Sequence, residues 1–357
     1  MLLNLTILPG DGIGPEVTAQ AVLVLQSVVE RFGHQLQLRE EKIGGAALAA
    51  GKDPLPAQTV QSCLASSAVL MGAVGAPGFD HYPNHLRPEA GLLRLRRELG
   101  AYANLRPAIS FTPLEEASPL RAELLRGTDL MIVRELLGGL YFGEPRSITG
   151  ADGARVATNT MTYGEAAIER IARIAFELAL QRRSQVLSVD KANVLECSRL
   201  WREVVIRVAR DYPAVQLTHM YVDSAAMSLV LRPRDFDVIL TENMFGDILS
   251  DQAGGVVGSL GLLASASIGG GVGLYEPVHG SAPDIAGKGI ANPLGAILSA
   301  ALLLRHSFQL ENEAACIERA VNAVLTQGWR TADLAGAGQE SISTTEMGRR
   351  VIAEVRR

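Results

Sequence analysis

Short apolar runs alternate with amphipathic stretches along most of this 357-residue chain. LNLTIL at 3–8 reads as a strand, the turn PGDGIGP follows it, and residues 16–32 then repeat apolar positions at helical spacing up to Gly33. This alternation is typical of an α/β fold. Further strands are predicted over 68–75, 129–136, 185–191 and 236–245, and further helices over 293–304, over 311–325 and from Pro88 onward.

Composition narrows the class of protein. Hydrophobic residues make up 48% and charged residues 20%, as in globular chains that bury a large core in one or two domains. A net charge of −5 argues against nucleic-acid binding but leaves room for a local basic site for a small anion. The three cysteines are far apart and odd in number, so they form neither a disulfide framework nor a zinc pattern and favour a reducing, cytoplasmic location.

The uncharged segment 252–275 is long enough to raise the question of a membrane span. Its many glycines and serines make it a poor spanning helix, and a tightly packed loop region is predicted there instead. The first residues, MLLNLTILPGDGIG, show no basic region followed by a long apolar segment, so no secretory signal is expected. The chain is therefore expected to be soluble and to have no membrane partner.

Two aspartates lie four residues apart in FGDILSDQ. On a helix, Asp247 and Asp251 share one face about one turn apart. A solvated acidic face is the plain interpretation of such a pair. Their position between an apolar run and a glycine-rich apolar segment favours a divalent cation, and carboxylate oxygens suit Mg²⁺ or Mn²⁺.

Arginines are concentrated in the segments LLRLRREL, YANLRP and IVREL. The guanidinium group suits bidentate binding of carboxylates. Arg94 and Arg97 are expected to be solvated on a helix surface. Arg106 and Arg134 lie within or at the end of apolar segments, where an arginine usually pairs with an anion of the protein or of a ligand.

Lys191 of SVDKANV lies just past a predicted strand, where α/β proteins place functional groups. A surface lysine is the default interpretation, but a nearby cation and arginines would favour its neutral form, as a general base requires. The segment 276–293, EPVHGSAPDIAGKGIANP, suits either a loop around a ligand or a purely structural set of turns. Asp284 in this segment is able to accept a hydrogen bond from a ribose hydroxyl and to repel a 2′-phosphate.

The N-terminal GDGIG resembles part of a dinucleotide-binding fingerprint. It provides G-x-G-x-G after its strand rather than G-x-G-x-x-G, and no acidic residue closes a second strand at the expected distance. A Rossmann site is therefore disfavoured.

Nearly the whole chain resembles the decarboxylating β-hydroxyacid dehydrogenases, the family of the isocitrate dehydrogenases, and within it the 3-isopropylmalate dehydrogenases. The motifs run in order from LPGDGIGPEV through RPEAGLLRLR, YANLRP, VRELLGGLYFGEPR, SVDKANVLE, MYVDSAAM and NMFGDILSD to VHGSAPDIAGKGIANP. The resemblance implies NAD-dependent, metal-dependent oxidative decarboxylation of 3-isopropylmalate to 4-methyl-2-oxopentanoate and CO₂, a step of leucine biosynthesis.

The resemblance also implies an open, mostly parallel twisted sheet in two domains with a cleft between them, and not a Rossmann fold. The first, cofactor-binding domain would combine residues 1–101 and 258–357. The second, residues 102–257, would carry the metal and substrate site and the dimer contacts. In this family Lys191 and Asp223 reach the active site from the partner subunit, which implies a homodimer with shared active sites.

The chemical roles are implied by matching positions. Arg96, Arg106 and Arg134 resemble the family's arginines that bind the two substrate carboxylates. The catalytic pair is implied to be Tyr141 and Lys191. The ligands of Mg²⁺ or Mn²⁺ are implied to be Asp223, Asp247 and Asp251, with Asp223 also contacting the substrate. The residues implied to contact NAD are Gly75, Glu276, His279, Gly280, Ser281, Ala282, Pro283, Asp284, Ile285 and Asn292.

Glu89, Leu92 and Leu93 occupy the positions that set substrate choice in this family. Isocitrate enzymes carry serine and asparagine there to hold a third carboxylate, whereas Leu92, Leu93 and Val194 would shelter an isopropyl group. Burying a mismatched polar group costs roughly 1–3 kcal/mol, so isocitrate is expected to be excluded. By the same comparison Asp284 and Ile285 fit NAD rather than NADP.

Two positions depart from the family pattern. Glu242 replaces a usual glycine and would either add charge near the metal or point outward. Ala264 replaces a common proline and is expected only to loosen a loop.

Two alternatives to this function stay open. A sister dehydrogenase acting on D-malate, tartrate or homoisocitrate would keep the same chemistry, although Glu89, Leu92 and Leu93 argue against it. A non-catalytic regulatory subunit would bind ligands without turnover, but it should have lost part of the catalytic and metal-binding set, all of which is present.

Overall fold

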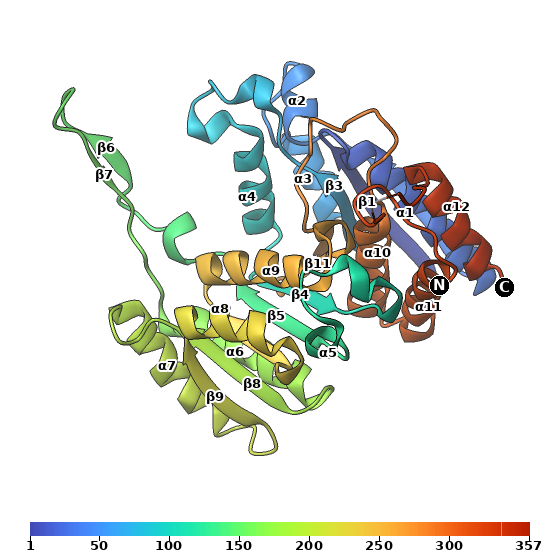
Figure 1. Ribbon diagram of the computed structural model, residues 1–357. Helices are drawn as coiled ribbons and strands as arrows, with labels where there is room; N and C mark the ends of the chain where they lie inside the picture. The colour runs from blue at the N-terminus through green and yellow to red at the C-terminus, as the bar shows by residue number, and fades with distance from the viewer. Residues whose placement is uncertain (337) are drawn as a thin grey trace.

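The computed structural model describes residues 1–336 and 338–357 and is built around one large sheet (Figure 1). The ten strands of this sheet lie in the order β2-β1-β3-β12-β11-β4-β5-β10-β8-β9. Their bounds are β1 Leu2–Gly10, β2 Gln35–Glu40, β3 Ala68–Ala73, β4 Ala103–Ile109, β5 Asp129–Glu135, β8 Gln185–Asp190, β9 Gln216–Tyr221, β10 Val238–Thr241, β11 Ala264–Ile268 and β12 Gly273–Pro277.

The sheet is open and mostly parallel, as predicted. Within this ten-stranded sheet, as far as the structure describes it, only the pairings of β11 with β12, β11 with β4 and β4 with β5 are antiparallel. Strands from residues 1–101 and 258–357 make up one half of the strand order, and strands from residues 102–257 make up the other half. The predicted division into two domains follows the same boundary between β11 and β4 and stays a prediction.

Helices cover both faces of the sheet. Successive side chains of a strand point to opposite faces, and β10 shows this: Val238 and Leu240 join the large core cluster that contains α6 and α7, whereas Ile239 joins the cluster under α8 and α9. The helices are α1 Gly14–Arg31, α2 Gly45–Ala49, α3 Ala57–Leu64, α4 Pro88–Glu98, α5 Ala122–Leu125, α6 Glu165–Leu180, α7 Glu196–Ala209, α8 Val222–Leu231, α9 Asn243–Val257, α10 Leu294–Phe308, α11 Glu311–Thr326 and α12 Thr344–Val355.

A two-stranded arm projects from the body between β5 and α6 (Figure 1). It consists of β6 (Ser147–Thr149) paired antiparallel with β7 (Val156–Thr158), and every residue of both strands is exposed. An isolated two-stranded hairpin is marginally stable in water, so this arm lacks the packing that the other strands have.

Three local predictions were wrong. The segment 252–275 is not a loop region, because α9 continues to Val257 and the small residues that follow form the paired strands β11 and β12. The strand predicted over 236–245 ends at Thr241, since α9 begins at Asn243. Ala264 lies buried in β11 opposite Pro277, so it loosens no loop. Among the described residues no helix is long and apolar enough to cross a membrane.

Candidate active site

Asp247 on α9 gathers three of the predicted site residues around its carboxylate. The Arg134 guanidinium and the Tyr141 hydroxyl both donate hydrogen bonds to it, the latter over 2.7 Å, and Nη1 of Arg106 lies 3.3 Å away. The same Arg106 nitrogen lies 3.5 Å from Asp251. Asp247 and Asp251 therefore face one arginine from adjacent turns of α9, as their spacing predicts.

Strand pairing brings the two arginines together. Arg106 lies on β4 and Arg134 on the neighbouring β5, where Arg134 is directly opposite Asn104. Tyr141 follows on a short 3-10 turn, Gly139–Tyr141, after β5. Gly139 has φ +72°, and a side chain there would collide with the Tyr163 hydroxyl, so this turn requires glycine.

The pKa values of Tyr141 and Asp247 are shifted in opposite directions by burial and by neighbouring charges. Burial raises the pKa of Tyr141 to about 12, and its hydrogen bond to Asp247 adds to the effect. Burial opposes ionisation of Asp247, but Arg134, Arg106 and the Tyr141 hydroxyl outweigh it and lower the pKa of that carboxyl. Burial lowers the pKa of Arg106 and Arg134, although guanidinium groups stay charged in proteins. The site thus combines a protonated phenol with an ionised carboxylate.

Glu242 caps α9. It does not point outward, and it makes no hydrogen bond with the Asp247 group, by which we mean Asp247, Asp251, Arg106, Arg134 and Tyr141. Its side chain is 3% exposed and accepts hydrogen bonds from the backbone N–H groups of Met244 and Phe245, at 3.0 and 2.8 Å. The Tyr163 hydroxyl lies 3.3 Å from it. A carboxylate at this position satisfies unpaired N–H groups and the positive end of the helix. The outward orientation offered from the sequence was wrong, whereas the added charge does act near the site, since it helps to raise the pKa of Tyr141.

Arg96 and Glu276, predicted for different ligands, form one buried ion pair of 2.7 Å. Arg96 lies on α4 and Glu276 on β12. The Nε of Arg96 is buried and has no hydrogen-bond partner among the described residues. A buried N–H without a partner is costly, so this nitrogen is an unexplained polar group beside the ion pair.

The specificity positions separate in space. Glu89, Leu93 and Tyr141 line one hollow of about 870 Å³ between α4 and the base of the β6–β7 arm. Leu92 instead packs against the core cluster of β3 and α4, and Val194 is largely exposed on the turn after Lys191.

Arg94 and Arg97 lie on the exposed face of α4, where solvated arginines were predicted. Arg94 is exposed but also pairs with Asp53 at 2.7 Å. Arg97 is also exposed and lies over the ring of Phe142.

Lys191 and Asp223 form a second group. Lys191 follows β8, Asp223 lies in the first turn of α8, and their side chains pair at 2.5 Å. Neither side chain is bonded to the Asp247 group. Among the described residues, no three His, Cys, Asp or Glu side chains lie close enough to hold a metal ion. One chain therefore does not bring Asp223 together with Asp247 and Asp251.

The loop after β1, dismissed as a Rossmann fingerprint, holds other loops in place. The Asp11 carboxylate accepts hydrogen bonds from the backbone N–H groups of Gly45, Ala46 and Gly75, at 2.9, 2.7 and 3.0 Å. A side chain on Gly75, which has φ +143°, would lie 3.0 Å from Ser281 and 3.4 Å from Glu89. Two predicted NAD contacts and one specificity position are therefore neighbours.

Glu16, which the sequence did not single out, fixes the predicted cofactor loop. Its carboxylate accepts hydrogen bonds from the backbone N–H groups of Gly287 and Gly289, at 2.6 and 3.1 Å. The backbone N–H of Ile13 donates to the Ser281 carbonyl at 2.8 Å. An acidic residue in the first turn of the helix that follows PGDGIG was the available signal, but its partners lie about 270 positions away.

The remaining predicted cofactor residues lie in the segment between β12 and α10. The side-chain Oδ1 of Asn292 accepts from the backbone N–H of Leu294 at 3.0 Å, and its Nδ2 donates to Asp333 at 3.0 Å. Burial lowers the pKa of His279, whose Nδ1 lies 2.9 Å from its neighbour's carbonyl oxygen. The loop between these two residues contains Gly280, Ala282, Pro283, Asp284 and Ile285, of which Gly280, Pro283 and Asp284 are exposed.

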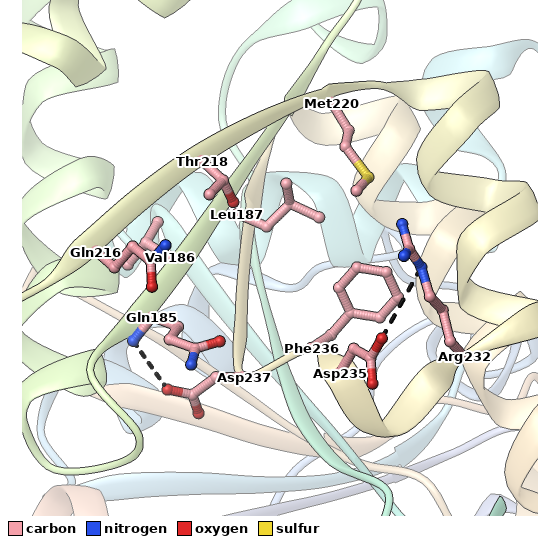
Figure 2. Close-up of a pocket in the computed structure, with 10 residues that line it drawn as sticks. All are labelled: Gln185, Val186, Leu187, Gln216, Thr218, Met220, Arg232, Asp235, Phe236 and Asp237. Atoms are coloured by element: carbon pink, nitrogen blue, oxygen red, sulfur yellow. Dashed lines mark hydrogen bonds and ion pairs between the residues drawn. The ribbon is translucent and has the colours of Figure 1, made fainter. Parts of the chain in front are cut away.

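A separate hollow of about 220 Å³ lies at the far edge of the sheet, between the starts of β8 and β9 and the segment after α8 (Figure 2). Gln185, Thr218 and Phe236 line it, and Arg232 lies 3.9 Å from Asp235 at its rim. None of the predicted site residues lines it. It is therefore distinct from the site described above.

Comparison with known proteins covers the whole chain. The family model described as isocitrate/isopropylmalate dehydrogenase matches residues 4–351. A 3-isopropylmalate dehydrogenase of Priestia megaterium is 56% identical over 97% of this chain and 94% of its own length. A 3-isopropylmalate dehydrogenase of Aquifex aeolicus is 52% identical over 99% of this chain and 97% of its own length.

Solved structures share the fold. The isocitrate dehydrogenase of Methylococcus capsulatus superposes with a TM-score of 0.88 at 37% identity, covering 99% of this chain and all of that one. A β-decarboxylating dehydrogenase of Thermococcus kodakarensis gives a TM-score of 0.79 at 38% identity, covering 99% of this chain and 96% of that one.

Proposed function

Because the chain belongs to the isocitrate/isopropylmalate dehydrogenase family, we propose that it catalyses the NAD-dependent oxidative decarboxylation of 3-isopropylmalate in leucine biosynthesis. The observation that carries the proposal is the group around Asp247, which unites two buried arginines, a protonated tyrosine and a pair of carboxylates. Arginines bind carboxylates, and the hollow lined by Glu89 and Leu93 opens beside Tyr141. These features fit a branched dicarboxylic acid.

The donor set fits a hard divalent cation. Asp247 and Asp251 converge on Arg106, so their oxygens face the same region, and carboxylate oxygens are the ligands that Mg²⁺ and Mn²⁺ prefer. A third carboxylate is needed, and the partner subunit's Asp223 would supply it. Asp223 is 64% exposed in its own chain and is therefore accessible to a second copy.

The proposed reaction gives each of these charged side chains one role. When bound, NAD⁺ supplies the hydride acceptor and the cation supplies a Lewis acid at the substrate hydroxyl and its neighbouring carboxylate. Arg96, Arg106 and Arg134 bind the carboxylates and neutralise their charge. The partner subunit's Lys191 removes the hydroxyl proton as the hydride leaves, and the resulting β-keto acid loses CO₂.

Tyr141 completes the reaction in this proposal. Its raised pKa keeps the phenolic proton in place until an enolate, a stronger base, forms beside it. In the unloaded chain this proton is donated to Asp247, and it would turn from that carboxylate to the enolate carbon once the substrate is bound. Transfer of the proton to the enolate carbon gives 4-methyl-2-oxopentanoate, and NADH leaves with the hydride.

A homodimer with shared active sites is part of the proposal. Large apolar side chains that are more than half exposed lie near Lys191 and along α8 and α9, and the arm carries two more. They are Val194, Met227, Leu231 and Ile248, with Ile148 and Val156 on the arm. Exposed apolar residues in such number mark an association surface. A second copy seated there would bring its Lys191 and Asp223 toward the Asp247 group.

The predicted domains and cofactor complete the proposal. Residues 1–101 with 258–357 and residues 102–257 would close on the substrate as two domains and exclude water from the hydride transfer. The exposed Asp284, in a loop fixed by Glu16, supports NAD over NADP because its charge repels a 2′-phosphate. Three free cysteines support a reducing, cytoplasmic location.

The test is NADH formation by the purified chain with 3-isopropylmalate, NAD⁺ and Mg²⁺ or Mn²⁺. Isocitrate and D-malate serve as parallel substrates, each with and without a chelator, and NADP⁺ replaces NAD⁺ in a further series. Chelator-sensitive turnover that favours 3-isopropylmalate and NAD⁺ is expected. Turnover with D-malate alone would identify a sister dehydrogenase, and binding without turnover in a folded dimer would identify a regulatory subunit.

A further inference from the structure

Arg106 and Arg134 are both anchored by the side chain of an asparagine. Nε of Arg106 donates to Oδ1 of Asn104 at 2.6 Å. Nε and Nη2 of Arg134 donate to Oδ1 of Asn243 at 3.0 and 2.7 Å. Both asparagines are completely buried. In each arginine the anchored edge of the guanidinium is turned away, and Nη1 is left to face the Asp247 group.

Two arginines outside the site, Arg182 and Arg202, are anchored by carboxylates instead. Arg182 is held by Asp129 and Asp237, at 2.8 Å each. Arg202 forms a bidentate pair with Asp190, also at 2.8 Å. A carboxylate fixes a guanidinium and cancels its charge, whereas an amide oxygen fixes it and leaves the charge in place. An amide anchor therefore leaves the guanidinium charge available to a ligand. Arg96, the third arginine assigned to the substrate, lacks this anchor and pairs with the Glu276 carboxylate.

We propose that Asn104 and Asn243 are positioning residues that orient Arg106 and Arg134 while preserving their positive charge for a substrate carboxylate. The inference rests on the proposed function, since it assumes that these arginines bind an anionic substrate. The charges of Asp247 and Asp251 do not defeat it, because the proposed cation would compensate them when the site is loaded. A carboxylate at position 104 would have no such compensation.

Asn104 is the better residue to test because its hydrogen bonds survive replacement by aspartate. Its amide nitrogen donates to the Ser267 hydroxyl at 3.0 Å, and that hydroxyl is free to rotate and donate to a carboxylate instead. Asn243 lacks this tolerance, since its amide donates to the carbonyl oxygens of Leu136 and Gly138. Asn104→Asp thus changes charge with little change in packing, whereas Asn104→Ala removes the anchor without adding charge.

The experiment compares both variants with wild type in kcat, in KM for the acid and for NAD⁺, and in thermal unfolding. Asn104→Asp should raise KM for the acid about tenfold or more, leave KM for NAD⁺ within about twofold and leave Tm unchanged or higher. Asn104→Ala should lower Tm, because it leaves the buried Nε of Arg106 unpaired, yet raise KM for the acid less than Asn104→Asp does. Exposed Asn322→Asp is the matched charge control and should change nothing.

Which of the two variants raises KM for the acid more, and which lowers Tm more, decides whether Asn104 preserves the charge of Arg106. A purely structural role would make Asn104→Ala the more damaging in both stability and KM, and that result would overturn the proposal. An unchanged KM for the acid in folded Asn104→Asp, or a large loss of Tm in that variant, would overturn it too. Wild-type turnover in the same assay tests the proposed function separately. If wild type prefers another dicarboxylate, the same ratios measured on that acid still decide the role of Asn104.

Discussion

The Tyr141 hydroxyl donates a 2.7 Å hydrogen bond to Oδ2 of Asp247, so the proposed general acid touches a carboxylate of the proposed metal site. The two residues are 106 positions apart in the chain and meet because the turn after β5 lies beside the first turns of α9. Each affects the protonation of the other: the contact helps to raise the pKa of Tyr141 and to lower that of Asp247. The proposed proton donation and the proposed metal binding would therefore be coupled at this contact.

Replacing Tyr141 with phenylalanine removes the donated proton but keeps the ring. General acid catalysis typically contributes about 10²–10⁴-fold, so kcat for NADH-linked decarboxylation of 3-isopropylmalate should fall by at least about 10²-fold. The Kd of the acid, measured by calorimetry with Mg²⁺ present, should change much less. Turnover at the wild-type rate would remove Tyr141 from this role.

The Asp247 carboxylate should stabilise the folded chain in a defined pH range. Its pKa is lowered on folding, so its contribution is complete above the unfolded-state pKa of about 3.9 and is lost as the pH falls through the lower folded value. The Tm difference between wild type and Asp247→Asn should therefore be constant above about pH 5 and shrink below about pH 4. Thermal unfolding between these limits checks it, and a difference that grows on acidification would contradict the assignment.

Metal binding should appear in stability as well as in activity. A ligand that binds only the folded state raises Tm, so Mn²⁺ should stabilise the wild-type protein and a chelator should reverse the effect. Asp251→Asn should lose most of this metal-dependent increase while retaining a similar Tm without metal, because Asp251 is more than half exposed. Equal stabilisation of wild type and variant by Mn²⁺ would place the metal elsewhere.

Mixing two inactive variants tests the shared site. Tyr141→Phe and Lys191→Ala each damage every site of their own homodimers, but a mixed dimer has one site with both native residues. Unfolding and refolding the variants together at equal amounts should recover about a quarter of wild-type activity, since half of the dimers are mixed and one site in two is intact. No recovery, in mixtures shown to contain mixed dimers, would mean that Tyr141 and Lys191 act within one chain.

Glu16 should control the affinity for NAD⁺ and not for the acid. Both of its carboxylate oxygens accept backbone N–H groups of the predicted cofactor loop, and in Glu16→Gln one of them is replaced by a donor. KM for NAD⁺ should rise about tenfold or more, as expected for the loss of one charge-assisted hydrogen bond, while KM for 3-isopropylmalate stays within about twofold. A parallel rise in both constants would indicate a general loss of structure.

Local features could be predicted from the sequence because they depend on neighbours in the chain. The alternation of strands and helices, and the placement of Asp247 and Asp251 on one helix face, follow from the periodicity of apolar positions and the 3.6-residue turn. The ends of the strands and helices were predicted less accurately. The strand predicted over 236–245 was too long because nothing in its apolar pattern shows that Glu242 caps a helix.

Contacts between distant segments were decided only by the tertiary structure. The order β11-β4-β5-β10 brings Arg106, Arg134 and α9 together, and the strand β12 brings Glu276 to Arg96, 180 positions away. The sequence by itself determined which groups are present: the arginines, the carboxylates, the tyrosine and the glycine-rich loops. The fold decided which of them share a site and which charge each one faces, because strand order and helix packing depend on burial over the whole core and not on local spacing.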